Sequence, residues 1–276
     1  MLELNDRVAV ITGAASGFGR ELAKACAAHG MRLVLADIKE VGLLETAALL
    51  PPDVDCMTAI CDVADAAAVN RLADEAYERF GNVDVLFNNA GIFTAGSLWK
   101  STPAEWSRVM RINVMGVANG VISFVPRMLE SGRAAHIVNT ASLAGLVSTP
   151  GFGVYTASKH AVVALTECLY RELRDAESLI GVSLLCPAWV STGLADPEAL
   201  PSRDAQDSDP QRNDALDLAR AAMQASRITA EDVAAMALTA VKENRFYVVT
   251  QKKSLVGVQL RMDDILVGRS PTGFQR

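Results

Sequence analysis

Residues 12–19 read Thr12-Gly13-Ala14-Ala15-Ser16-Gly17-Phe18-Gly19 and stand between a continuous apolar run, Val8–Ile11, and a segment with helical periodicity, Gly19–His29. Glycines permit a tight turn and let a ligand approach the backbone closely. The beginning of a helix presents unpaired N–H groups, which suit the pyrophosphate of a dinucleotide. A glycine-rich turn alone is weak evidence, because turns need glycine anyway. Its position between a strand and a helix makes dinucleotide binding the favoured interpretation.

Apolar runs of strand length alternate with longer helical segments along the rest of the chain. The further expected strands are Leu33–Ala36, Val83–Phe87, His136–Asn139, Val182–Leu185 and Phe246–Thr250. The further expected helices are Ala66–Phe80, Pro103–Glu130, Tyr155–Asp175 and Ala230–Lys242. Pro126 is expected to kink the second of these or end it early. The alternation predicts an α/β fold with a doubly wound, Rossmann-like parallel sheet that has helices on both faces.

The domain organisation is expected to be simple. Residues 1–276 form a single Rossmann-like domain in this interpretation. Residues 193–226 are rich in Asp, Pro, Ser and Ala, and a long polar insertion of this kind predicts a substrate lid or a disordered segment. Residues 252–276 form a C-terminal extension, part of which should pack because its apolar residues recur at helical spacing: Leu255, Val258, Met262, Ile265 and Leu266.

The composition argues against several functional classes. A net charge of −6 does not suit nucleic acid as a partner. The sequence has no run of about 18 apolar residues, so no transmembrane helix is expected. The N-terminus lacks the features of a signal peptide. The five cysteines are an odd set without CxxC spacing, which indicates reduced thiols in a cytoplasmic protein. No cluster of metal ligands stands out, so no metal site is expected.

The second expected strand leads to Asp37, eighteen residues after Gly19. An acidic residue near this spacing binds the adenosine ribose in Rossmann folds. Its carboxylate accepts hydrogen bonds from the ribose hydroxyls and repels a 2′-phosphate, which favours NAD over NADP. Lys39 leaves NADP open, because a nearby cation could accommodate a phosphate. The spacing is also compatible with a plain acidic cap on the next helix.

Further motifs resemble the short-chain dehydrogenase/reductase family from Arg7 to about Val249. These are the spacing T-G-x-x-x-G-x-G, the run Asn88-Asn89-Ala90-Gly91 after a strand, and Tyr155-x-x-x-Lys159. The resemblance implies a set of cofactor-binding residues: Gly13, Ser16, Gly17, Phe18, Gly19, Asp37, Asp62, Val63, Asn89, Ala90, Gly91, Tyr155, Lys159, Pro187, Val190 and Thr192. The chain departs from the family at Ala188, where glycine is usual, and has Trp189 beside it. These departures are expected to alter the pocket wall and leave the chemistry intact.

The resemblance also implies a catalytic tetrad: Asn113, Ser142, Tyr155 and Lys159. Tyrosine and lysine four residues apart share one face of a helix. A phenol of pKa about 10 is a poor base at neutral pH, and a nearby ammonium and a positive nicotinamide should favour the phenolate. Ser142 can hydrogen-bond the substrate oxygen. By resemblance, Lys159 also binds the nicotinamide ribose, and Asn113 holds a water that connects the lysine to solvent.

The expected substrate site is mostly apolar. Its residues are Ser142, Leu143, Phe152, Tyr155 and Trp189, with Phe93, Leu146 and residues from Leu194 onward as further candidates. This lining predicts a small hydrophobic secondary alcohol or its ketone.

Two segments, around Ala161–Leu165 and Val114–Val117, are apolar nearly all round. Such helices are buried on both sides, so we expect a homo-oligomer, either a tetramer, which is usual in the family, or a dimer.

Three other functions share part of these motifs. An NADPH-dependent carbonyl reductase would have the same catalytic residues, and Asp37 argues against it. A sugar-nucleotide epimerase also uses Tyr-x-x-x-Lys, but it resembles an extended branch of the family with different glycine spacing and a larger C-terminal domain. A non-enzymatic dinucleotide-binding sensor could lose catalytic residues freely, whereas this chain has the complete tetrad.

Overall fold

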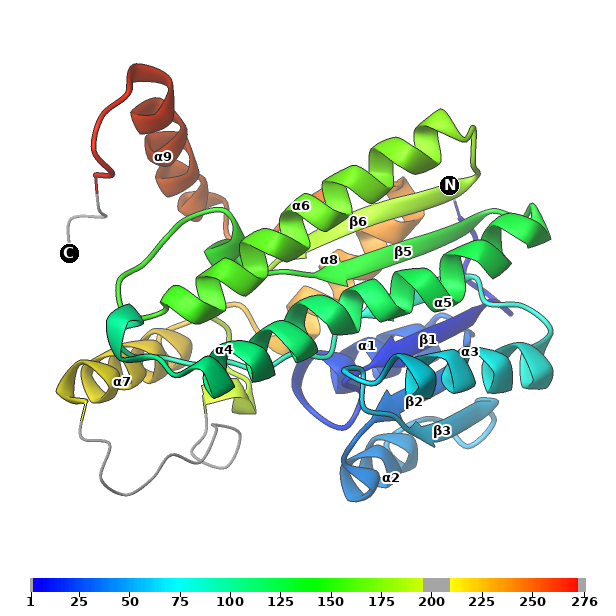
Figure 1. The fold of residues 1–276 in the computed structure, drawn as a ribbon. Coiled ribbons are helices and arrows are strands. Elements are labelled where there is room, and N and C mark those ends of the chain that lie inside the picture. Colours follow the sequence, from blue (N-terminus) through cyan, green and yellow to red (C-terminus); the bar gives the residue numbers. More distant parts are fainter. Residues whose placement is uncertain (1, 196–208, 273–276) are drawn as a thin grey trace.

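The computed structural model describes residues 2–195 and 209–272. It has a seven-stranded parallel sheet in the order β3-β2-β1-β4-β5-β6-β7 (Figure 1). The strands are β1 Val8–Thr12, β2 Arg32–Asp37, β3 Cys56–Ile60, β4 Val85–Asn88, β5 Ala135–Thr140, β6 Ile180–Cys186 and β7 Tyr247–Val249. Strands β1, β4, β5 and β6 are buried along their whole length, because helices cover both faces. The predicted fold class is confirmed.

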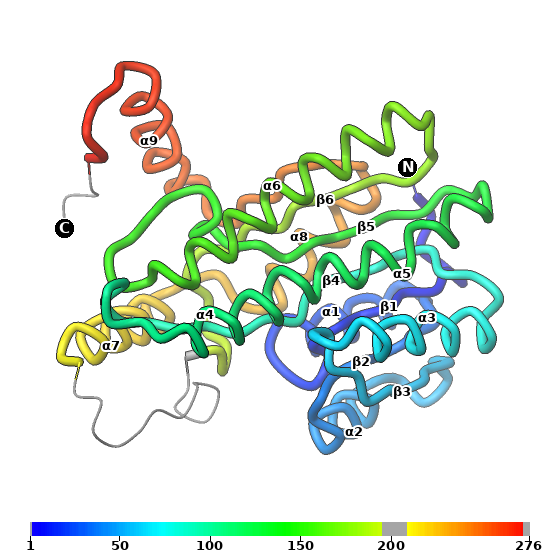
Figure 2. Tube along the Cα trace, in the orientation of Figure 1, coloured from blue at the N-terminus to red at the C-terminus, as the bar shows by residue number. Residues whose placement is uncertain are grey.

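Two sets of helices enclose the sheet. One face carries α1 Gly17–Ala28, α2 Glu40–Ala48 and α8 Ala230–Glu243. The other carries α3 Ala66–Phe80, α5 Gly116–Ser131 and α6 Gly153–Asp175 (Figures 1 and 2). Each face has an apolar core of its own, with Leu22 and Leu43 in the first and Leu72 and Phe124 in the second. The alternating apolar runs of the sequence account for these two layers.

A strand and an α-helix in the first half of the chain do not appear among the sequence expectations. β3 is an edge strand, and two of its five residues are exposed, so no continuous apolar run marks it. Helix α2 has nine residues and buries only Leu43 and Thr46. The expected early end of a helix at Pro126 is wrong, since α5 continues to Ser131. Pro126 and Ile122, the residue four positions before it, lie on the exposed side, where water can satisfy the carbonyl that proline leaves free.

The helical run Pro103–Ser131 is long and apolar enough to cross a membrane by length and composition alone. It consists of α4 Pro103–Met110, a π-helical segment Arg111–Met115 and α5. Half of its apolar window is buried inside the protein, where α5 packs against the sheet and α3. A buried core helix passes the same test, and the packing identifies this run as one.

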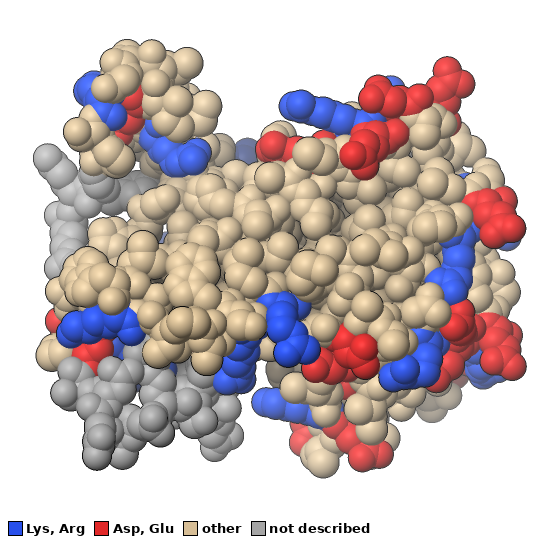
Figure 3. All heavy atoms as spheres, in the orientation of Figure 1, with Lys and Arg blue, Asp and Glu red and all other residues tan. Residues whose placement is uncertain are grey.

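The outer surface of α5 and α6 is partly apolar. Ile122 and Leu129 are exposed on α5, Met115 is exposed just before it, and Tyr170 is exposed on α6. Figure 3 shows few charged side chains over the middle of this face, while acidic and basic groups gather along its edges. A second copy of the chain against this face stays a prediction.

The C-terminal extension forms helix α9, Leu255–Val267, which stands away from the sheet and its covering helices (Figures 1 and 2). The helical spacing predicted the helix. Of the five apolar residues named for packing, Val258 is half-buried, while Leu255, Met262, Ile265 and Leu266 are exposed within one chain. Asp264 is buried instead, where it accepts hydrogen bonds from Arg269 and Thr272. Periodicity identifies a helix but does not say which surface covers it.

Candidate active site

A large pocket of about 390 Å³ lies at the carboxyl ends of the central strands. It is lined by residues that directly follow β1, β2, β4, β5 and β6, namely Gly13, Ile38, Asn89, Ala141 and Pro187. Ligands of open parallel sheets bind at this edge, next to the point where the strand order reverses between β1 and β4. The pocket is lined by the predicted cofactor residues except Gly19 and by the predicted catalytic residues except Asn113. The five main substrate residues line it too, while Leu146, one of the further candidates, does not.

The glycine-rich turn has a backbone that only glycine adopts easily. Gly13 and Gly17 have φ angles of 70° and 52°. A Cβ atom on Gly19 would lie 2.0 Å from the Gly13 carbonyl oxygen, so Gly19 allows the helix to close against the turn. Ser16 begins α1 without a side-chain cap, and the first N–H groups of the helix are therefore left for another acceptor. This turn fits the pyrophosphate of a dinucleotide.

Asp37 ends β2 and lies at the edge of the same pocket. Its two carboxylate oxygens accept hydrogen bonds from the backbone N–H groups of Ala15, at 3.1 Å, and Lys39, at 3.0 Å. These contacts hold the carboxylate beside the glycine-rich turn. Asp37 is not the N-cap residue of α2, because Lys39 occupies that position.

The Asn88-Asn89-Ala90-Gly91 run joins the central strands. Asn88 donates to the Asn139 side chain at 2.9 Å, which links β4 to β5. Asn89 donates to the Thr12 carbonyl at 3.0 Å, and the Thr12 hydroxyl accepts from the Asn89 and Ala90 N–H groups. Two adjacent amides therefore hold the floor of the pocket in place from within the sheet.

Ser142, Tyr155 and Lys159 converge in the pocket from two elements. Ser142 follows β5, while Tyr155 and Lys159 share one face of α6 and are 8% and 4% exposed. The Lys159 ammonium donates to the Thr140 carbonyl at 2.9 Å and lies 5.8 Å from the centre of the Tyr155 ring. The Ser142 hydroxyl lies close enough to the Tyr155 phenol to lower its pKa. A hydroxyl, a phenol and an ammonium are thus within reach of one substrate oxygen.

Asn113 lies behind the pocket wall. It belongs to the π-helical segment between α4 and α5, where its carboxamide accepts from the Ile92 N–H at 2.8 Å and donates to the Ile92 carbonyl at 2.9 Å. Its amide nitrogen also donates to the Ser158 hydroxyl at 3.0 Å. Asn113 therefore braces the backbone beside Gly91 from behind. Its water-holding role stays a prediction.

Burial dominates the protonation of the two buried groups on α6. It raises the pKa of Tyr155 to about 12, against a smaller lowering effect of the hydrogen bond with Ser142. Burial also lowers the pKa of Lys159 to about 8. In the protein alone, desolvation therefore holds the phenol above its ordinary pKa, and the lowering of that pKa by the ammonium and a positive nicotinamide stays a prediction.

One wall of the pocket is aromatic and extends into α7, Pro210–Gln224. Phe93 lies 5.5 Å from Phe152 and 5.1 Å from Tyr155 between ring centres, and Trp189 lies 5.6 Å from Phe152. Met223 of α7 also lines the pocket.

The pocket lining differs from the expectation at several positions. Leu146, expected in the lining, packs instead in a separate core cluster with Val163. Arg108, Ile112 and Thr149 line the pocket without having been expected.

Helix α7 falls within the predicted lid, residues 193–226, of which residues 196–208 lie outside the described part of the chain. The polar composition of this segment concealed the helix. Its buried positions recur at helical spacing in the sequence and could have revealed it: Ala215, Leu216, Ala219 and Met223.

A parallel sheet in this order, with a glycine-rich turn before α1 and a serine, tyrosine and lysine in one pocket, is the architecture of a dinucleotide-dependent oxidoreductase. Residues 7–201 match the family model described as short chain dehydrogenase. The chain therefore belongs to the short-chain dehydrogenase/reductase family.

Similar proteins extend this result over the whole chain. A crystal structure of a short chain dehydrogenase/reductase from Burkholderia phymatum in complex with NAD is 46% identical, covers 100% of both chains and superimposes with a TM-score of 0.95. A CLA biosynthesis dehydrogenase/reductase of Lactiplantibacillus plantarum is 33% identical over 98% of this chain and 97% of its own length. A 1-deoxy-11-beta-hydroxypentalenate dehydrogenase of Streptomyces exfoliatus is 33% identical over 96% and 90%. The chain is thus a dehydrogenase or reductase of this family.

Proposed function

We propose that this protein interconverts a small hydrophobic secondary alcohol and its ketone, with NAD(H) as cofactor and Tyr155 as the acid and base. The observation that carries the proposal is the convergence of Tyr155, Ser142 and Lys159 beside an aromatic wall. Two of the similar proteins bear on it. One is bound to NAD, and another is named for a dehydrogenase that acts on 1-deoxy-11-beta-hydroxypentalenate.

The chemistry follows from the positions of these side chains. NADH, when bound, supplies the hydride that adds to the carbonyl carbon. Tyr155 donates its phenolic proton to the carbonyl oxygen, and Ser142 holds that oxygen by a hydrogen bond. Lys159 keeps a positive charge near the phenol and stabilises the phenolate that remains. In the opposite direction the phenolate accepts the hydroxyl proton of the alcohol.

The preference for NAD over NADP rests on Asp37. Its carboxylate stands at the pocket edge with both oxygens oriented by backbone N–H groups, and it leaves no favourable place for a 2′-phosphate. An NADPH-dependent carbonyl reductase is the second candidate. Lys39 supports it, because this cation lines the same edge.

The decisive variant is Tyr155→Phe, which removes the phenolic oxygen and keeps the ring. We expect turnover of alicyclic and aryl ketones to fall about a hundredfold to ten-thousandfold, because the proton donor is lost. The dissociation constant for NADH should stay near its original value. Tyr170→Phe is the matched control, since Tyr170 lies on the exposed side of the same helix.

Near-original turnover in Tyr155→Phe would refute the proposed mechanism. The same experiment separates the enzyme from a non-enzymatic dinucleotide sensor. A sensor would bind NADH and show no turnover with any ketone or alcohol even before the substitution.

A further inference from the structure

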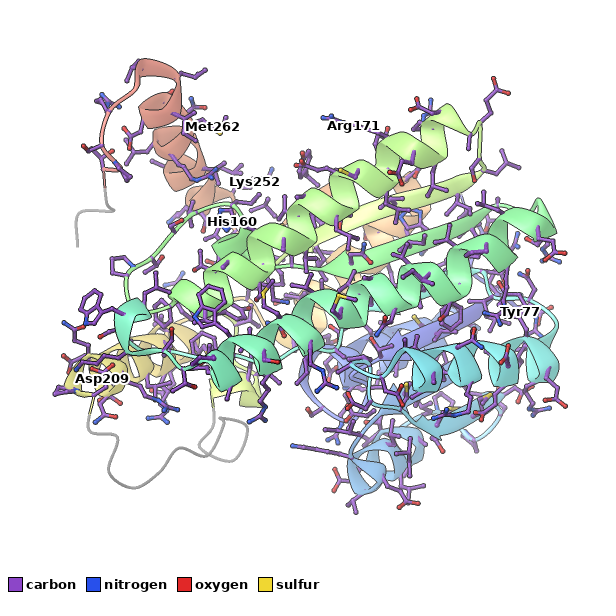
Figure 4. The ribbon with its side chains drawn as sticks, viewed as in Figure 1. Tyr77, His160, Arg171, Asp209, Lys252 and Met262 are labelled. Carbon is purple, nitrogen blue, oxygen red and sulfur yellow. The ribbon has the colours of Figure 1, made fainter. Side chains whose placement is uncertain are left out.

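Helix α7 contributes Met223 to the pocket lining and packs against its aromatic wall, so the position of this helix affects the shape of the pocket. Ala215, Leu216, Ala219 and Met223 pack on the aromatic cluster that contains Phe93, Phe152 and Tyr155. Asp209 stands at the first position before this helix, and Figure 4 shows it at the beginning of α7. What holds Asp209 therefore holds this end of the wall.

Asp209 is bound to a different segment of the chain. Its side chain is 0% exposed, and one oxygen accepts from the Ser97 N–H at 3.1 Å while the other accepts from the Lys100 ammonium at 3.1 Å. The Ser97 hydroxyl is 3.5 Å from the same carboxylate. An aspartate at this position usually caps its own helix, but this side chain makes no such bond. A buried carboxylate requires specific partners, and here residues 97–100 provide them.

The partner segment continues to the aromatic wall. The Gly96 N–H donates to the Gly151 carbonyl at 2.8 Å, and Gly96 forms a parallel bridge with Phe152. Gly96 has a φ angle of 138°, which a residue with a Cβ rarely adopts. Three segments are thus joined in series, from α7 through residues 96–100 to residues 151–152, which lead directly into the helix that carries Tyr155.

We infer that Asp209, with Ser97 and Lys100, is a positioning cluster that sets the shape of the substrate pocket and thereby how well it accepts the larger among its apolar substrates. The inference rests on the proposed function, because it concerns the substrate side of the same pocket. The cluster touches neither the tyrosine nor the glycine-rich turn. Its loss should therefore affect the binding of large substrates and leave cofactor binding unchanged.

The test compares Asp209→Ala with Asp217→Ala, a matched control on the exposed side of the same helix. The kcat/KM values of a bulky alicyclic ketone and of acetone are measured. Their ratio is the readout, because a smaller amount of folded enzyme would lower both values by the same factor and leave the ratio unchanged. We expect the ratio to fall about tenfold in Asp209→Ala, mostly through a higher KM for the bulky ketone, since a buried charged hydrogen bond is lost. The NADH dissociation constant should not change.

Hydrogen exchange provides a readout that does not depend on activity. The amides of residues 210–224 and 96–100 should exchange faster in Asp209→Ala than in Asp217→Ala, while those of α1 and β1 should be unaffected. Lys100→Met is the milder second variant, because Lys100 is 46% exposed and its loss should not prevent folding. Lys100→Arg keeps the cation and should restore the substrate ratio.

Two results would overturn the inference. The first is an Asp209→Ala protein with the same substrate ratio and the same α7 exchange as the control. The second is a uniform increase in exchange with weaker NADH binding, which would make Asp209 a general stabiliser of the fold. Failure of the proposed function would look different, since Tyr155→Phe would then keep its turnover whatever the Asp209 variants do.

Discussion

Replacement of Asp37 by asparagine tests the cofactor preference most directly. The substitution keeps the size of the side chain and removes its charge. In the structure each carboxylate oxygen already accepts one backbone N–H, from Ala15 or Lys39, which leaves one further acceptor direction on each for the ribose hydroxyls. Asparagine must turn its NH₂ group towards one of these N–H donors. The local turn will therefore be disturbed for both cofactors.

The expected magnitudes follow from two terms. Loss of hydrogen bonds to a charged acceptor costs about 1.5–3 kcal/mol, so NADH should bind about tenfold to a hundredfold more weakly. A 2′-phosphate carries a charge of about −1.5 to −2, and its repulsion from a carboxylate at about 4 Å in a water-like medium is about 1.5–2 kcal/mol. Removal of that repulsion favours NADPH about tenfold. The ratio of the two dissociation constants should shift by at least about a hundredfold in total.

The assay is the quenching of tryptophan fluorescence by each cofactor. Trp189 lines the pocket and should supply the signal, which Trp189→Phe would verify. Glu40→Gln is the matched control, because Glu40 is an exposed acid close to Asp37 that does not line the pocket. The ratio is the decisive quantity, since disturbance of the turn affects both cofactors alike. The assignment is refuted if the original protein prefers NADPH or if Asp37→Asn leaves the ratio unchanged.

Two further predictions concern pH. Burial raises the pKa of Tyr155 to about 12, so alcohol oxidation, which needs the phenolate, should accelerate up to about tenfold per pH unit from about pH 6 to about pH 8, the range in which Lys159, with a pKa of about 8, keeps its charge. Ketone reduction should change little over this range. Initial rates in both directions measure this, and pH-independent oxidation would contradict it. Burial lowers the pKa of His136 from 6.5 to about 4. Between these two pH values the unfolded chain protonates this histidine and the folded protein does not, so the free energy of unfolding should fall by about 3 kcal/mol as the pH drops from about 6.5 to about 4. Urea unfolding of His136→Gln should show a weaker loss, and an equal loss would exclude His136 as the cause.

Local sequence determined the elements whose residues carry their own signals. The periodicity of residues 66–80 predicted α3 with the bounds that the structure has. The apolar runs of the buried strands predicted most of the sheet, because strands covered on both faces must be apolar throughout. β3 has only one neighbouring strand and some exposed residues, so this signal is absent.

The glycine-rich turn, Asp37 and the Tyr155-Lys159 pair were predictable for the same reason. Each depends on contacts within a few residues or on a spacing that one helix or one strand imposes, and the sequence records such relations directly. The structure brings these groups to one edge of the sheet, as the parallel order requires.

Only the tertiary structure decided the substrate side. The contacts of Asp209 with Ser97 and Lys100 join residues more than a hundred positions apart, and no local pattern marks them. The bracing of Ile92 by Asn113 and the high pKa of the buried Tyr155 likewise depend on what packs around them. Local spacing reports the chemistry that a short segment can perform, whereas burial and long-range pairing arise only when distant segments meet.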